Sequence, residues 1–204
     1  IDLGYNFFWT ILKNHEKLFR NKIAIRDIYQ NKNFTYKELK DYSLVLSSNL
    51  NKIVKTSTLG ILLPNCYQVL ISHYAIAILN KTILNLNINL QENELLYILK
   101  NSNKIDTLVT SSDYKNILGN ILKQTEINNI IWIDELVNIP DIENYNFESL
   151  LENSSNEMII YKTINDSHFH MYYTSGTTGN PKGVLLTYDN VIKHMLGAII
   201  EMKI

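Results

Sequence analysis

The chain has 204 residues, of which 46% are hydrophobic and 19% are charged, and its formal net charge is −1. This length and apolar content suit one globular domain or a large part of one, and they exclude disorder as the dominant state. The near-zero charge argues against a protein that binds nucleic acid or anionic membranes, which normally carries a basic excess. A single cysteine, Cys66, excludes an intrachain disulfide and a cysteine-rich metal cage.

The ends of the sequence, its longest uncharged stretch and its single cysteine indicate whether the chain is complete, whether it spans a membrane and in which compartment it is found. The chain begins with Ile1 and stops at Ile204 inside an apolar helical pattern, so we interpret it as a fragment trimmed at both ends. The stretch 56–80 carries no charged side chain, but Gly60, Pro64 and Asn65 interrupt it. We therefore expect a buried strand and a buried helix there instead of a membrane span. With its lone thiol, we expect the protein in a reducing compartment, the cytoplasm.

Hydrophobic periodicity predicts alternating helices and strands in the first half of the chain. Thr35 with Glu38, and Asn89 with Glu92, have the spacing of capping boxes, and Asn65 is the expected cap of a third helix. The expected elements are a helix at 7–19, a strand at 23–28, a polar turn at 30–33, a helix after residue 35, a strand at 59–63, a helix at 65–77, a strand at 82–86 and a helix ending near 102.

The second half continues the alternation and completes the prediction of the fold. The expected elements are a strand at 106–110, a helix at 113–123, a strand at 130–133, an irregular connection at 135–157 with one short helix near Phe147, strands at 169–173 and 184–186, and a helical apolar stripe at 191–200. Alternation of this kind predicts an α/β fold, with a layered, mostly parallel sheet and helices on both of its faces.

The most specific segment runs from residue 172 to residue 184 and reads YYTSGTTGNPKGV. Its glycines allow positive φ and let peptide N–H groups converge without side chains in the way. Its lysine supplies a mobile positive charge, a usual partner of polyphosphate oxygens. A merely solvated turn rarely needs so many glycines, hydroxyls and a lysine together. We expect the segment to bind an anion with several oxygens, namely a nucleotide triphosphate.

The segment differs from a Walker loop. Lys182 follows Gly176 by six positions, but Pro181 stands where that motif needs glycine, and Gly183 stands where it needs serine or threonine. The flanking pattern is also strand–loop–strand, whereas a Walker loop opens a helix. A P-loop GTPase or ATPase is therefore disfavoured.

Residues 173–184 resemble the phosphate-loop signature of the adenylate-forming (AMP-binding) superfamily. That superfamily includes acyl-CoA synthetases, the adenylation domains of peptide synthetases and beetle luciferases. Weaker similarity covers most of the chain: FTYKEL at 34–39 resembles the family's TYxEL helix start, LLPN at 62–65 the segment before its second helix, and 94–102 a later helix. The resemblance implies a partial N-terminal adenylation domain over residues 1–204, with the C-terminal part and the small lid domain absent.

The resemblance also implies a two-step reaction. A carboxylate attacks the α-phosphorus of MgATP to form an acyl-adenylate and pyrophosphate, and a thiol, commonly coenzyme A, then displaces AMP. The family's loop holds the β- and γ-phosphates, which makes Lys182 the candidate catalytic residue and the Thr174 hydroxyl a candidate contact for Mg²⁺. Carried over position by position, the nucleotide-contacting candidates are Thr174, Ser175, Gly176, Thr177, Thr178, Gly179 and Lys182.

Other parts of the family's machinery are expected downstream of residue 204. These are its adenine pocket, magnesium-binding glutamate, ribose-binding aspartate, catalytic lysine and most of its acyl pocket. We therefore expect these 204 residues alone to have no measurable ligase activity.

Two departures from the family pattern stand out. The family usually has glycine near residues 80–82, where this chain reads NKT, and a basic residue or histidine near 188–190, where this chain reads YDN. The segment LNLNIN at 84–89 lacks the Leu-Pro-x-Asp-Pro of peptide synthetases, which favours the acyl-CoA synthetase branch, with a fatty acid as the expected substrate. A peptide-synthetase adenylation domain and a non-catalytic nucleotide-binding member remain the alternatives.

The histidines raise the alternative of a metal site. His168 and His170 are two apart on an expected strand and should face the same side, but no third ligand lies near them in the sequence, and a catalytic zinc needs three. We interpret them as two partly exposed strand histidines, and His73 as an isolated residue on a helix.

Overall fold

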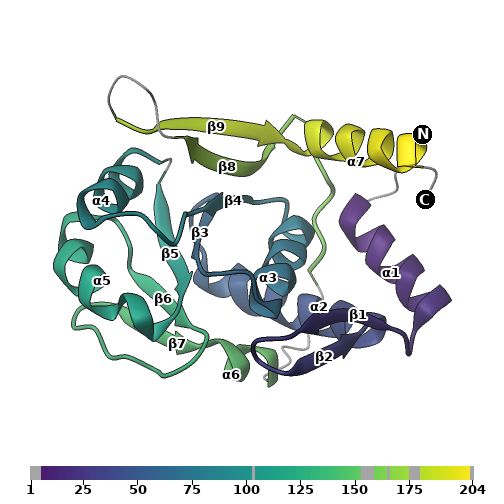
Figure 1. Ribbon diagram of the computed structural model, residues 1–204, viewed down its shortest axis with the longest axis horizontal. Coiled ribbons are helices and arrows are strands. Elements are labelled where there is room, and N and C mark those ends of the chain that lie inside the picture. The colour runs from purple at the N-terminus through teal and green to yellow at the C-terminus, as the bar shows by residue number, and fades with distance from the viewer. Residues whose placement is uncertain (1–5, 103, 153–158, 165, 175–179, 203–204) are drawn as a thin grey trace.

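The computed structural model describes residues 6–102, 104–152, 159–164, 166–174 and 180–202 (Figure 1). The order of its elements confirms the predicted alternation. The helices are α1 (Phe7–Phe19), α2 (Tyr36–Ile53), α3 (Tyr67–Ile78), α4 (Glu92–Asn101), α5 (Lys115–Ile121), α6 (Phe147–Glu152) and α7 (Tyr188–Met202). The strands are β1 (Ile23–Asp27), β2 (Lys32–Thr35), β3 (Thr58–Leu62), β4 (Thr82–Asn85), β5 (Ile105–Thr110), β6 (Asn129–Trp132), β7 (Glu143–Asn146), β8 (His168–Thr174) and β9 (Lys182–Thr187).

The main sheet has the strand order β7-β6-β5-β3-β4-β8-β9. Every neighbouring pair is parallel except β8 and β9, which are antiparallel. The predicted mostly parallel sheet is therefore confirmed. Because the strands from β7 to β8 run the same way, their carboxyl ends share one edge, where open α/β sheets bind their ligands.

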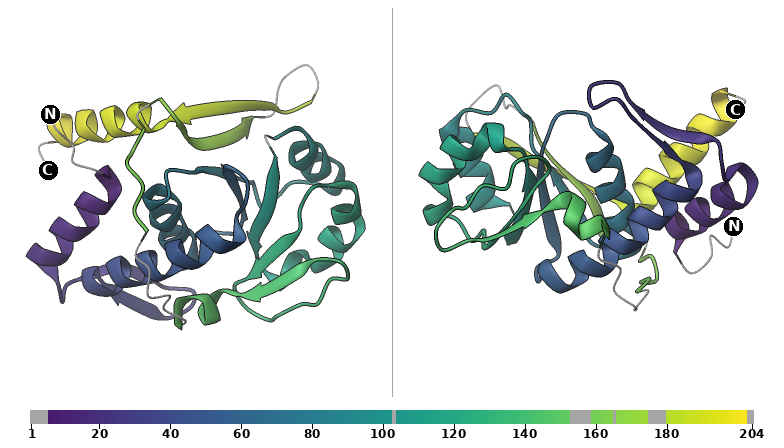
Figure 2. Two further views of the ribbon diagram at one scale, coloured as in Figure 1. Left: turned by 180° about the vertical axis from the view of Figure 1, so that it is seen from behind. Right: turned by 90° about the horizontal axis from the view of Figure 1, so that it is seen from below.

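Helices cover both faces of the sheet, as predicted, and each face has its own core. The strand β6 shows the division: Ile131 packs with side chains of α1, α2 and α3, whereas Ile130 and Trp132 pack with side chains of α4 and α5. Alternate residues of one strand thus enter opposite layers, the arrangement that a sheet buried on both sides requires. Figure 2 shows the two layers from two further directions.

The first helix is fastened to distant parts of the chain through Asn6. The side chain of this fully buried residue caps α1 by accepting a hydrogen bond from the Trp9 N–H, at 2.9 Å. Its amide nitrogen donates to the carbonyls of Ala77, Ile78 and Tyr161, at 3.1, 3.3 and 2.7 Å. One side chain therefore joins the start of α1, the end of α3 and the segment before β8.

Helix α2 begins as the sequence predicted, whereas α3 and α4 begin differently. Thr35 and Glu38 form the capping box of α2. The expected cap of α3, Asn65, is wrong, because the helix begins at Tyr67 and its N–H donates to Oδ2 of Asp27, at 3.0 Å. A carboxylate from β1, 40 residues upstream, thus does the work of a local cap.

The cap expected for α4 is two residues too early. Asn89 donates its N–H to Oδ1 of Asn87 in a turn, at 2.9 Å, and so lies outside the helix. The Gln91 N–H instead donates to Oε2 of Glu94, at 2.9 Å. Asparagine side chains stabilise turns as readily as they cap helices. Because residues 85–93 contain four asparagines, the sequence alone does not show at which of them the helix begins.

Two strands and one helix boundary also differ from the sequence prediction. β2 lies where a polar turn was expected, and β7 lies inside the connection expected to be irregular apart from the short helix now seen as α6. Both strands are polar and lie at sheet edges, so they lack the apolar pattern of a buried strand. The expected helix at 113–123 is a shorter α5 between two 3₁₀ turns, Ser112–Tyr114 and Leu122–Gln124.

The missing family glycine near residue 80 is replaced by an asparagine in the same kind of backbone conformation. Asn80 has φ 52°, in the left-handed region that favours glycine and tolerates asparagine. Its Oδ1 also accepts hydrogen bonds from the Ile164 N–H and the Ser167 hydroxyl, at 3.0 and 3.3 Å. The departure therefore preserves the turn into β4 and adds a contact to the segment before β8.

We predict that Asp27→Ala lowers the free energy of unfolding by about 1–3 kcal/mol, because the buried Tyr67 N–H loses its acceptor. Urea denaturation followed by circular dichroism measures the change. Asp166→Ala, which removes an exposed aspartate, is the matched control and should have little effect. Equal stabilities of the two variants would contradict the assignment of Asp27 as the cap of α3.

We predict that Asn80→Ala is less stable than Asn80→Gly by about 1 kcal/mol. Both variants lose the same side-chain acceptor, but only alanine is strained at φ 52°. The two midpoints of thermal unfolding give the comparison directly. A more stable alanine variant would show that this turn does not depend on left-handed backbone.

Candidate functional site

The candidate site lies where β8 and β9 meet at the carboxyl edge of the parallel strands. The predicted strand–loop–strand is confirmed by the antiparallel pairing of these strands, with Thr174 opposite Lys182 and Tyr173 opposite Gly183. Two of the seven candidate residues, Thr174 and Lys182, are thereby placed. The other five lie outside the described residues: Ser175, Gly176, Thr177, Thr178 and Gly179.

Thr174 and Lys182 present a hydroxyl and an ammonium group on one face of the hairpin. Directly opposed residues of an antiparallel pair point to the same side, with Cβ atoms about 5 Å apart. Both residues are exposed, and Lys182 makes no ion pair with any residue that the structure describes. The two groups are therefore available to an anionic ligand at the mouth of the loop.

Gly183 belongs to β9, where its role is to leave room for a neighbouring ring. A Cβ at this position would lie 3.3 Å from Cζ of Tyr173, the residue opposite it. The Tyr173 ring packs against the core under α4, on the other face of the sheet from Thr174. The last glycine of the motif thus leaves room for the Tyr173 ring, which packs against the core and holds the hairpin. The motif alone indicated only that its glycines permit loop conformations.

A row of side chains continues from Thr174 into the protein. Tyr172 and His170 follow at two-residue spacing on the same face of β8, and their rings stack with centroids 5.5 Å apart. Nδ1 of His170 lies 3.1 Å from Nδ2 of Asn85, and Oδ1 of Asn85 lies 3.1 Å from Nε2 of His73. An imidazole–amide–imidazole chain therefore joins β8, β4 and α3 directly below the loop.

The expectation of two partly exposed histidines on β8 is wrong. His168 is exposed, but His170 is only 9% exposed, because it pairs with Ile83 of β4 and the rings of His73, Phe169 and Tyr172 lie against it. His73, expected to be isolated, is half-buried beside His170, with ring centroids 5.2 Å apart. The described residues hold no group of three or more His, Cys, Asp or Glu side chains that could bind a metal ion.

Burial disfavours the protonated form of both imidazoles in the imidazole–amide–imidazole chain. It lowers the pKa of His73 below its ordinary value, and it lowers the pKa of His170 to about 4, with the proximity of His73 as a second cause. The sequence places Asn85 and His170 on expected strands and His73 on an expected helix. No pattern within a few residues indicates that these three side chains meet, because they lie on elements that are far apart in the chain.

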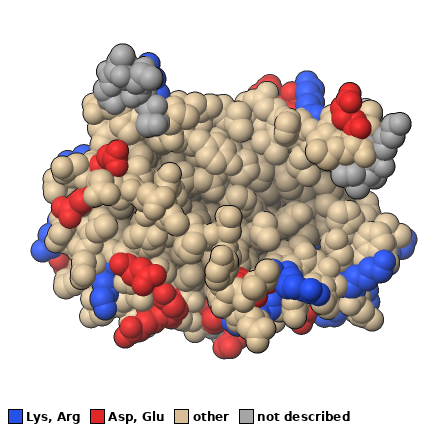
Figure 3. All heavy atoms as spheres, in the orientation of Figure 1, with Lys and Arg blue, Asp and Glu red and all other residues tan. Residues whose placement is uncertain are grey.

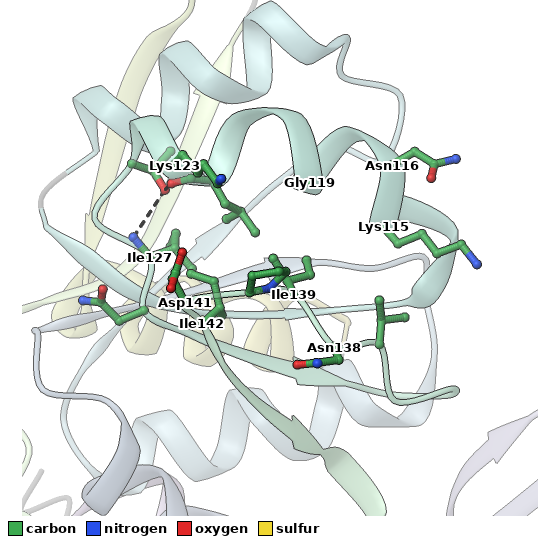
Figure 4. Close-up of a pocket in the computed structure, with 14 residues that line it drawn as sticks. Lys115, Asn116, Gly119, Lys123, Ile127, Asn138, Ile139, Asp141 and Ile142 are labelled. Carbon is green, nitrogen blue, oxygen red and sulfur yellow. Dashed lines mark hydrogen bonds between the residues drawn. The ribbon is translucent and has the colours of Figure 1, made fainter.

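A separate cavity of about 550 Å³ lies between α5 and the segment 137–142, with a partly apolar lining (Figure 4). Lys115 extends away from it, so its lysines do not converge on one point. Figure 3 shows charged side chains around the rim of the molecule, with an uncharged hollow at its centre. Neither the cavity nor its lining contains a residue of the motif. The candidate site is therefore the hairpin of β8 and β9, where the motif residues lie at the carboxyl edge of the sheet.

Comparison with known proteins assigns the chain to a family. Residues 12–203 match the AMP-binding enzyme family, and the chain belongs to that family. The long-chain-fatty-acid–CoA ligase of Bacillus subtilis strain 168 is 28% identical over 214 residues, which covers 90% of this chain and 37% of that protein. The chain thus spans somewhat more than a third of that relative's length.

Solved structures of similar fold include two CoA ligases. The anthranilate CoA ligase AuaEII, in complex with anthranoyl-AMP, matches with a TM-score of 0.84 at 19% identity, over 98% of this chain and 38% of the other. A long-chain-fatty-acid-CoA ligase from Archaeoglobus fulgidus matches with a TM-score of 0.83 at 20% identity, over 98% and 40%. These likenesses confirm the predicted fold class, an α/β adenylate-forming domain. Within the described residues, no helix combines the length and apolar content that a membrane crossing requires.

We predict that Gly183→Ala lowers the free energy of unfolding by about 1 kcal/mol, because its Cβ displaces the Tyr173 ring. The cost should disappear when the ring is removed first, so that Gly183→Ala is neutral in a Tyr173→Ala background. Chemical denaturation of the four proteins in this double-mutant cycle measures the coupling. A coupling energy of zero would contradict the packing role of Gly183.

Proposed function

We propose that the complete protein activates a carboxylic acid with ATP to an acyl-adenylate and then forms a thioester with coenzyme A. The observation that carries this proposal is the motif of residues 173–184, held on the hairpin of β8 and β9 at the carboxyl edge of the sheet. The relatives support the reaction class: the similar Bacillus subtilis protein is named a CoA ligase, and the AuaEII structure contains an acyl-adenylate. A fatty acid is the proposed substrate, on the name of the first of these.

We propose that Lys182 holds the charge of the leaving pyrophosphate. A cation placed beside the departing phosphates stabilises the charge that develops when the α-phosphorus is attacked, without needing to reorganise. The exposure of Lys182 and the lack of an ion-pair partner in the described part of the chain fit this role. Ser175, Gly176, Thr177, Thr178 and Gly179 complete the proposed phosphate cradle.

Magnesium is part of the proposed substrate, MgATP. The exposed Thr174 hydroxyl is an oxygen donor of the kind that Mg²⁺ accepts, and it lies beside Lys182. Mg²⁺ normally keeps several waters and binds through the phosphates with few protein ligands. A single hydroxyl therefore fits this arrangement, with Thr174 as the proposed contact.

As to domains, we propose that residues 1–204 form the N-terminal part of the adenylation domain, and that the remainder of the active site lies in the rest of the polypeptide. The match of residues 12–203 and the 37% coverage of the Bacillus subtilis relative support this division.

We predict that Lys182→Ala slows adenylation by the complete protein about 10²–10³-fold. Pyrophosphate exchange with a panel of fatty and aryl acids measures the first step, and thioester formation with coenzyme A measures the second. Lys193→Ala, which removes an exposed lysine on α7, should leave both steps unchanged.

The outcomes separate the alternatives. Exchange without any CoA thioester would favour a carrier-protein acceptor, as in peptide synthetases. MgATP binding without exchange would favour a non-catalytic member. No exchange with any acid and no binding of MgATP would overturn the proposed function.

A further inference from the structure

Among the described residues, the side chain of Asn85 makes the last side-chain hydrogen bond between β4 and β8 before the loop. The pairing of β4 with β8 ends at Asn85 and Tyr172, and beyond that point Tyr173 and Thr174 pair only with β9. β9 is itself the edge strand of the sheet. The pairing of β8 with β4 is therefore the one strand pairing that joins the hairpin to the parallel part of the sheet.

Asn85 holds β8 through a buried bridge with a defined direction. Its Oδ1 faces Nε2 of His73 and its Nδ2 faces Nδ1 of His170, both at 3.1 Å. With this amide orientation, His73 donates its Nε2 proton to Asn85, and Nδ1 of His170 accepts a proton from Asn85. His170 must be neutral for the chain to form in this way, because a protonated His170 has no acceptor at Nδ1, whereas His73 can donate from Nε2 in either protonation state.

The surroundings of the two imidazoles keep the bridge intact at neutral pH. The titratable side chains that contact His170 are His73 from α3 and Tyr172 from β8, and its other ring neighbour is Phe169. Neither imidazole has a carboxylate partner among the described residues. Since burial lowers the pKa of His170 to about 4 and none of these neighbours stabilises its protonated form, its Nδ1 stays an acceptor over the range in which free histidine titrates.

We propose that Asn85 is a positioning residue for the nucleotide loop: it ties β8 to β4 and α3 through His170 and His73, and so sets where Thr174 and Lys182 stand. The proposal rests on the proposed function in that the loop is taken to bind MgATP. Asn85 itself lies below the loop, two pairing steps from Thr174, and acts only through β8.

The test uses the complete polypeptide and two replacements of Asn85. Amide hydrogen exchange at residues 172–174 and 182–184, corrected for intrinsic rates, measures the positioning. Titration with MgATP measures its effect on binding, with each variant compared with the wild type at the same pH. We predict that Asn85→Leu speeds exchange about 10-fold and weakens MgATP binding about 10-fold at every pH from 8 to 5.5, because both hydrogen bonds are lost.

Asn85→Asp distinguishes positioning from general destabilisation. At pH 8 it should lie between Asn85→Leu and the wild type, since the new carboxylate still accepts from Nε2 of His73 but meets the neutral His170 only when that ring carries its proton on Nδ1. As the pH falls to 5.5, the carboxylate favours a proton on His170, which then donates to it, and the variant should return to within about 2-fold of the wild type. His168→Gln, an exposed histidine of the same strand, is the control and should behave as the wild type throughout.

A wild-type-like Asn85→Leu variant, or an Asn85→Asp variant that is as impaired as Asn85→Leu at pH 5.5, would overturn the proposal. If neither variant folds, His170→Phe keeps a ring against Tyr172 and removes the acceptor, and it must speed exchange in the same residues. Wild-type exchange in that variant would also overturn the proposal. If the exchange responds as expected but the wild type binds no MgATP, the proposed function fails while the positioning role stands.

Discussion

The structure depends on one long-range constraint, the parallel pairing of β8 with β4. These strands are more than 80 residues apart in sequence, yet Ile83 pairs with His170, and the Thr82 hydroxyl donates to the His168 carbonyl at 2.8 Å. The chain between them forms α4, α5 and α6 and the strands β5, β6 and β7 before it returns to the sheet beside β4. The return of the chain places the motif at the carboxyl edge of the sheet, the edge at which open α/β sheets bind their ligands.

The residues of the motif divide into those that face a ligand and those that hold the hairpin. Thr174 and Lys182 point to one face, whereas Tyr173 points to the other and packs over Gly183 into the core under α4. The alternation of a strand thus gives one short sequence two simultaneous tasks. The proposed anion binding relies on the first set, and the position of the hairpin relies on the second.

Features of the fold that depend on neighbouring residues could be predicted from the sequence. Features that depend on contacts between distant residues could not. The capping box of α2 and the apolar strands were readable because each is written within a few residues, as with Thr35 and Glu38. The cap of α3 was not, because its acceptor, Asp27, lies 40 residues away. The polar edge strand β7 lacked any apolar period. At the site, the chemistry of Lys182 was evident from the motif, whereas the bridge at Asn85 required strand pairing that no local pattern records.

The anchoring of α1 by Asn6 has a consequence for how the protein is made. Its hydrogen bond to the Tyr161 carbonyl joins residues 155 apart, so helix α1 cannot reach its final seat until the segment before β8 has been synthesised. At translation rates of about 5–20 residues per second, that delay is roughly 8–30 s. Throughout that interval Phe8 lacks two of its ring neighbours, because Phe169 and Tyr188, whose ring centroids lie 4.8 and 6.0 Å from its own, follow later still. The first helix can pack early on α2 and α3, but its aromatic side is completed only when β8 and α7 have been made.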